Sequence, residues 1–277
     1  ATARQLSRGL AAPFVIRGDI DAVPEVAAAD EHILLLQDFE LDRSGTVIEP
    51  FMQERMHGRE GSLVTVGGAI NPIIPIRQNG LLRLRLVNAS SSRFYRLQLE
   101  DHPLHLIGID GSGLDSVRSV DDVLFVPGQR LDILIEGSRS DGSFRLLNLP
   151  YDRGREMMGG MMGNRREVAA PGTLATIQYR GRAERTWTIP TSLTGKIAPL
   201  APSGPAPRTF QLGMGMMGGG MMRMGSGMSF TINGKTFDAN RIDSAPRPGT
   251  VEDWIYITPT STAHPMHLHT NPSPPAP

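Results

Sequence analysis

Three histidines near the C-terminal end of the sequence are the residues best suited to chemistry: His264, His267 and His269, in the run H-P-M-H-L-H. His267 and His269 are two positions apart, so on a β-strand both side chains lie on one face. Pro265 follows His264, which is therefore expected to point elsewhere. Neutral imidazole suits copper, zinc, iron or nickel, and this arrangement can serve two metal positions. A tag remnant or a chance cluster is the alternative, but the spacing and the strand-rich stretch before it favour metal ligands.

Methionine is the second candidate ligand, because most of the 14 methionines fall in two glycine-rich segments. The first segment contains Met157, Met158, Met161 and Met162, and the second contains Met214, Met216, Met217, Met221, Met222, Met224 and Met228. Thioethers are soft ligands that favour Cu(I), and glycine leaves the backbone free to wrap a metal. A flexible low-complexity surface loop is the alternative, while core packing would require a period that both segments lack. We expect Cu(I) binding here.

Short β-strands must position these candidates. Leu81 to Val87 reads L-L-R-L-R-L-V, which places leucines on one face and Arg83 and Arg85 on a solvated one. Similar strands are predicted at His32–Gln37, Leu63–Val66, Tyr95–Leu99, Val123–Val126, Leu131–Ile135, Phe144–Leu147, Leu174–Tyr179, Ser229–Ile232, Thr236–Phe237 and Asp253–Ile257. One helical turn is expected at Val26–Asp30. Many short strands separated by Pro/Gly turns predict an all-β, antiparallel sandwich.

Composition limits the possible functions. The 277 residues suggest about two domains, and 39% hydrophobic with 20% charged residues is ordinary for a globular protein. The formal net charge of zero argues against nucleic acid or an anionic membrane as the main partner. The absence of cysteine rules out disulfides, thiolate nucleophiles and thiolate metal sites within this chain. No stretch reaches membrane-spanning length, and no signal peptide is recognisable.

The H-P-M-H-L-H run resembles the first C-terminal copper motif of the multicopper oxidases, and the middle of the chain resembles the second cupredoxin domain of bacterial laccases in that family. The residues that carry this second resemblance are Val87–Ser90, Arg93–Leu97, Asp101–Leu104, Asp110-Gly111, Pro127–Arg130 and Leu149–Gly154. The resemblance implies a cupredoxin-like Greek-key β-sandwich.

The resemblance also implies roles for the three histidines. His264 would bind the type 1 copper, His267 the type 2 copper and His269 a type 3 copper of the trinuclear cluster, with no catalytic residues apart from these ligands. The middle domain of the family carries no copper. We therefore expect His102 and His105, whose H-P-L-H run echoes the later motif, to be structural histidines at the sandwich edge.

Several family motifs are missing from this sequence. The two H-x-H motifs of the first domain and the late H-C-H segment do not occur, although a blue copper site needs a cysteine. The resemblance thus implies a fragment that lacks the first domain and the C-terminal part of the third. The expected parts are a first-domain remnant at 1–17, the second domain at 18–180 with a Met-rich loop at 151–171, a linker and Met-rich segment at 181–228, and a partial third domain at 229–277.

The function implied by the resemblance is that of a copper-dependent oxidoreductase. The parent protein would oxidise phenols, aromatic amines or Cu(I) and reduce O₂ to water, in the periplasm or outside the cell, whereas this chain alone is expected to be inactive. Its partners would be a small phenolic or aromatic substrate or Cu(I), and O₂, with neither nucleic acid nor a membrane. The alternative is a copper-binding β protein that uses its Met-rich segments and has no oxidase activity.

Overall fold

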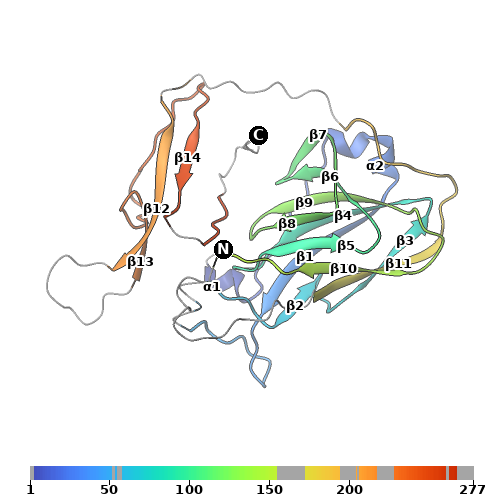
Figure 1. The fold of residues 1–277 in the computed structure, drawn as a ribbon, viewed down its shortest axis with the longest axis horizontal. Coiled ribbons are helices and arrows are strands. Elements are labelled where there is room, and N and C mark those ends of the chain that lie inside the picture. The colour runs from blue at the N-terminus through green and yellow to red at the C-terminus, as the bar shows by residue number, and fades with distance from the viewer. Residues whose placement is uncertain are drawn as a thin grey trace. The chain divides into compact units, whose positions relative to one another are not determined.

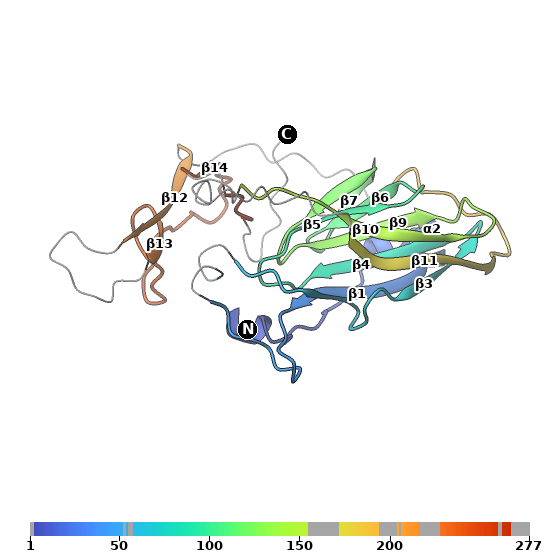
Figure 2. The same ribbon diagram turned by 60° about the horizontal axis from the view of Figure 1, so that its bottom comes forward.

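The computed structural model describes residues 3–51, 54, 58–154, 172–193, 204, 206–216, 228–259 and 262–266. These residues belong to two compact units. The first contains the described parts of Ala1–Asp152, Arg165–Lys196 and Pro265–Pro277, and the second contains those of Arg153–Asn164 and Ile197–His264. Figure 1 and Figure 2 show the elements of both units from two sides.

The first unit is a sandwich of two β-sheets, which confirms the predicted all-β architecture. One sheet has the order β2-β1-β4-β9-β6-β7, and the other has the order β3-β11-β10-β5-β8. Their strands are β1 (Asp30–Phe39), β2 (Leu63–Val66), β3 (Ile73–Gln78), β4 (Leu81–Asn88), β5 (Tyr95–Leu99), β6 (Leu104–Ile109), β7 (Ser112–Val120), β8 (Asp122–Phe125), β9 (Arg130–Glu136), β10 (Ser143–Leu149) and β11 (Gly172–Arg182). Short helices α1 (Ala3–Leu6), η1 (Asp19–Ala22) and α2 (Pro24–Ala28) precede them.

The core lies between the two sheets and follows the period of two. Leu82, Leu84 and Leu86 of β4 are buried there, as their alternation predicts. Tyr95 of β5 and Phe125 of β8 contribute from the opposite sheet. Each sheet buries one face against the other. A shift of one residue in the pairing of a strand would therefore turn all of its apolar side chains away from the core.

Two expectations about the sheets are wrong. The sandwich is not purely antiparallel, because β1 runs parallel to β4 and β3 runs parallel to β11. Long connections between these strands make the parallel pairing possible. The outer face of β4 is also not solvated at Arg83, whose side chain is only 2% exposed. A second apolar cluster covers the outside of the same sheet and includes Val26 from α2 and Leu193 from the segment after β11.

Arg83 lies at the centre of a buried charge cluster on that covered face. Its guanidinium donates to Asp132 on β9 at 2.6 and 2.9 Å, and to Asp21 of η1 at 2.6 Å. Glu31 accepts from Arg17 at 2.5 Å and lies 3.4 Å from Arg83. Burial alone would raise the pKa of Asp21, but hydrogen bonds from the Gly18 N–H, Arg83 and Arg17 outweigh it and lower this pKa to about 2. The cluster therefore fastens η1 to the sheet through charged hydrogen bonds.

Asn88, at the end of β4, joins the two sheets. Its side-chain amide is buried and donates to the carbonyl oxygens of Arg93 and Phe125, both at 3.0 Å. Its side-chain oxygen accepts from the Ser90 N–H, and its backbone bonds to Gly128 and Gln129 of the loop before β9. One residue thus satisfies backbone groups from the β4–β5 loop, the end of β8 and the β8–β9 loop at this end of the sandwich.

The second unit contains a sheet with the order β13-β12-β14, built from β12 (Arg208–Met216), β13 (Met228–Ile232) and β14 (Trp254–Ile257). β12 pairs antiparallel with β13 and parallel with β14. The last two strands agree with the expected ones, but Thr236–Phe237 does not form a strand. β12 lies within the span 181–228 that was expected to be linker and Met-rich segment.

The Arg83 cluster gives a testable prediction about stability. Replacing Arg83 by Met removes the buried guanidinium that bonds both Asp21 and Asp132 and leaves them only Arg17 and Arg85, so the free energy of unfolding should fall by about 3 kcal/mol. Arg145→Met is the matched control, because Arg145 pairs with Glu100 while its side chain is 57% exposed. Urea unfolding followed by circular dichroism measures both. Equal losses for the two variants would contradict this assignment.

Candidate functional site

The structure describes one of the three histidines proposed as copper ligands. His264 lies in an exposed, irregular stretch, and His267 and His269 fall outside the described residues. The described part of the chain contains no group of three or more His, Cys, Asp or Glu side chains that could hold a metal ion. The ligand assignments of His264, His267 and His269 therefore stay predictions, and no reaction step is derived through copper.

The structure places part of the second Met-rich segment in a β-hairpin. Met214 and Met216 belong to β12, and Met228 begins β13. The register pairs Met216 directly with Met228, and Met214 with Phe230. The remaining methionines of both segments, Met157, Met158, Met161, Met162, Met217, Met221, Met222 and Met224, lie outside the described residues. The hairpin thus brings together two ends of the segment that are separated in sequence.

His102 is held in one tautomer by its neighbours. Its Nδ1 lies 2.8 Å from the Glu100 carbonyl oxygen, which can only accept, so Nδ1 carries the hydrogen. Its Nε2 lies 2.8 Å from the Tyr179 hydroxyl and accepts from it. The Tyr179 oxygen accepts in turn from the Arg139 backbone N–H at 3.2 Å. Both ring nitrogens are committed to the protein, which confirms the expected structural role and leaves no lone pair for a metal.

His105 is also a structural residue. It is 9% exposed, and its Nδ1 lies 2.7 Å from the Ser119 hydroxyl on β7. Burial lowers the pKa of this imidazole below its usual value, because a low-dielectric environment disfavours the charged form. His105 therefore links β6 to β7, and His102 links the turn before β6 to Tyr179 of β11.

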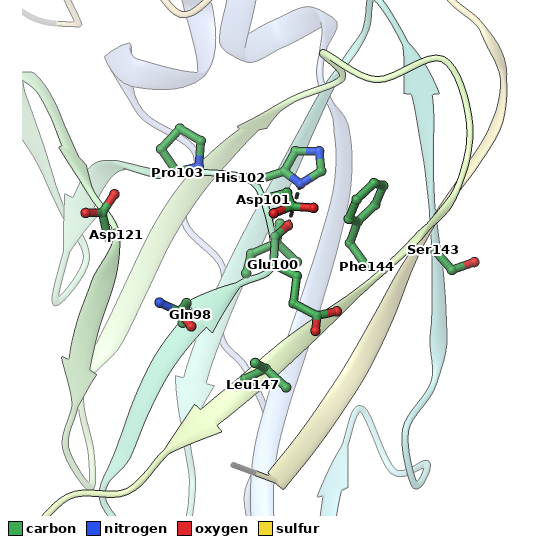
Figure 3. A pocket seen from close by; sticks show the side chains of 10 residues that line it. Gln98, Glu100, Asp101, His102, Pro103, Asp121, Ser143, Phe144 and Leu147 are labelled. Atoms are coloured by element: carbon green, nitrogen blue, oxygen red, sulfur yellow. Dashed lines mark hydrogen bonds between the residues drawn. The ribbon is translucent and has the colours of Figure 1, made fainter.

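An open groove of about 740 Å³ lies where β5 ends and β10 begins, beside the turns that precede β6 and β8. Figure 3 shows Gln98 and Leu147 projecting from β5 and β10, with Phe144 beside His102 and Asp121 across the groove. Asp101 and Asp121 lie in different turns, so only the folded chain brings them to one groove. No sequence signal for this groove existed, since three separate segments form it.

Comparison with known proteins agrees with this architecture. A family model described as multicopper oxidase matches residues 36–182, more than half of the chain, and a second model of the same description matches residues 206–273. The chain belongs to the multicopper oxidase family. The first match covers the runs in the middle of the chain that carried the resemblance, and the second covers the H-P-M-H-L-H run.

Solved multicopper oxidases share the fold of this family member. The McoA 2F4 variant from Aquifex aeolicus has a TM-score of 0.77 and 26% identity over 97% of this chain and 58% of that chain. A multicopper oxidase from Campylobacter jejuni, described as a metallo-oxidase, has a TM-score of 0.68 and 26% identity over 84% of this chain and 48% of that chain. The predicted cupredoxin-like fold is therefore confirmed.

One curated relative is named for cell division and not for oxidase activity. The cell division protein FtsP of Escherichia coli (strain K12) is 30% identical over 269 residues, covering 91% of this chain and 51% of that protein. The chain of this multicopper oxidase family member thus spans about half the length of the curated relatives that it matches. Within the described residues no helix approaches membrane-spanning length, and α2 has just five residues.

Burial of His105 predicts that the first unit becomes less stable in acid. As the pH falls below about 6.5, the unfolded chain takes up a proton at this imidazole before the folded chain does. The contribution of His105 is therefore complete above that pH and is lost as the pH falls. Urea unfolding of the wild type and of His105→Gln should show a smaller decline between about pH 7.5 and 5 for the variant. His32→Gln is the control, and an unchanged decline in His105→Gln would refute the prediction.

Proposed function

We propose that this chain supplies the middle cupredoxin domain and part of the third domain of a copper-dependent oxidoreductase. The parent protein would oxidise phenols, aromatic amines or Cu(I) and reduce O₂ to water. The observation that carries the proposal is the H-P-M-H-L-H run within the second family match, residues 206–273. Imidazole is a ligand that copper readily accepts.

The described sandwich would serve as a scaffold in this protein. His102 and His105 are buried and bonded to protein groups, so they do not compete for metal. His264 would contribute to a type 1 copper, and His267 and His269 to the trinuclear cluster. Bound copper would supply the one-electron oxidation and the reduction of O₂. A chain with no cysteine cannot complete a type 1 site by itself, so the activity would depend on residues beyond this sequence.

The Met-rich segments would bind Cu(I) as a second function of the same protein. Support comes from the soft thioether donors and from the β12–β13 register, which pairs Met216 with Met228. The chain would then bring Cu(I), a possible substrate, close to the protein surface. We also propose a periplasmic or secreted location, which rests on the family resemblance alone.

A second candidate function is a role in cell division without oxidase activity. The match to FtsP, at 30% identity over 91% of this chain, favours it. This candidate differs from the first in a measurable way, because it needs no copper at the histidine cluster.

Copper loading of the purified chain tests the first proposal. We expect the wild type to retain Cu(II), and the variant with His264, His267 and His269 all replaced by Ala to lose it, as measured by elemental analysis and electron paramagnetic resonance. His32→Ala should bind as the wild type does. Equal copper content in the triple variant and the wild type would reject the ligand assignment and favour the second candidate.

The same loaded chain should show no blue absorption and no O₂ consumption with a phenol or with Cu(I), because the thiolate of a type 1 site is absent. Measurable turnover by this chain alone would contradict that expectation.

Titration with Cu(I) tests the Met-rich segment separately. Replacing Met214, Met216, Met217, Met221, Met222, Met224 and Met228 by Ala should weaken Cu(I) binding by at least roughly ten-fold, since soft ligands are removed. Met52→Ala is the control, because Met52 lies outside both Met-rich segments and outside the H-P-M-H-L-H run in the sequence. Competition with a chromophoric Cu(I) chelator gives the affinity, and unchanged affinity in the multiple variant would refute the proposal.

A further inference from the structure

The groove of Figure 3 combines polar side chains with a partly exposed aromatic ring. Leu99 and Leu147 are only 2% and 7% exposed, and Leu99 belongs to the core between the sheets, so Phe144 is the apolar side chain that a ligand could contact. Gln98, Asp101 and Asp121 project around it. At about 740 Å³ the groove is large enough for a small molecule.

Three polar side chains at this groove have no protein partner. The Gln98 amide and the carboxylates of Asp101 and Asp121 make no side-chain hydrogen bond or ion pair with the described part of the chain. Glu100 differs from them, because both of its oxygens accept from Arg145, at 2.5 to 2.9 Å. The groove thus offers two acceptor carboxylates and one amide that can both donate and accept.

The loop that carries Asp101 is fixed before any ligand arrives. Asp101 has a left-handed backbone with φ of 53°, and its carbonyl oxygen accepts from the Arg139 guanidinium at 3.1 Å. The next residue, His102, is anchored at both ring nitrogens. A preformed loop lowers the conformational entropy lost on binding.

The chemistry of the groove favours an uncharged, hydroxyl-rich ligand. The described residues provide no group suited to a metal ion. Arg139 and Arg145 lie beside Asp101 and Glu100, so their positive charges offset much of the local negative charge and reduce the attraction for an organic cation. Carboxylate and amide groups beside the partly exposed Phe144 ring suit a ligand ring with hydroxyls at its edge and C–H groups on its face. We propose that this groove binds a neutral saccharide.

Titration of the full chain with cellobiose tests this proposal by saturation-transfer difference NMR and calorimetry. We expect saturable binding with a dissociation constant on the order of millimolar, as for a small ligand with few hydrogen bonds. Asp101→Asn, Asp121→Asn and Gln98→Met should each weaken it roughly ten-fold, the equivalent of one lost hydrogen bond to a charged or buried group. Asparagine tolerates the left-handed backbone of position 101, so the fold should survive.

Asp141→Asn is the matched control, because Asp141 is exposed near the same end of the sheet but does not line the groove. It should bind cellobiose as the wild type does. Spermidine is the second probe. If the groove were a site for organic cations, the wild type would bind spermidine, Asp101→Asn would no longer bind it, and Gln98→Met would still bind it. That pattern, or the absence of saturable cellobiose binding by the folded wild type, would overturn the proposal.

Discussion

The sandwich depends on one buried side chain that satisfies polar backbone at the end of both sheets. A strand end inside the protein leaves carbonyl and N–H groups that water cannot reach, and each unsatisfied group is costly. Asn88 removes this cost through the Arg93 and Phe125 carbonyls and through its own backbone bonds to Gly128 and Gln129. The apolar faces can therefore meet while these backbone groups keep hydrogen-bond partners where the chain crosses between the sheets.

The same junction explains why the family could be identified from short motifs. Val87–Ser90, Arg93–Leu97 and Pro127–Arg130, three of the runs that carried the resemblance, meet at Asn88. Ser90 in turn bonds the buried Tyr95 hydroxyl at 2.9 Å. These motifs hold the scaffold together, so their presence identifies the fold and says little about catalysis. The copper assignments depend on a different and much shorter stretch of sequence.

Strands with alternating leucines, such as β4, could be predicted because their pattern is set by the core. β3 was missed because Pro75 interrupts its apolar run, and the structure accommodates the proline at a sheet edge, where the missing N–H is tolerated. β7 was missed because none of its residues is buried and its strand form depends on pairing with β6. The histidine roles at 102 and 105 followed from the family, while the groove at Gln98, Asp101 and Asp121 depended on tertiary contacts that no local pattern encodes.

The enclosed charge cluster around Arg83 has a consequence for ionic strength. Dissolved ions screen charges that they can approach, so the exposed Arg145–Glu100 pair weakens as salt is added. The Arg83 side chain is nearly inaccessible to solvent, and its bonds to Asp21 and Asp132 lie between η1 and the sheet. The attachment of η1 and the neighbouring α2 to the sandwich is therefore largely independent of salt. These elements should stay packed on the sheet through large changes in ionic strength.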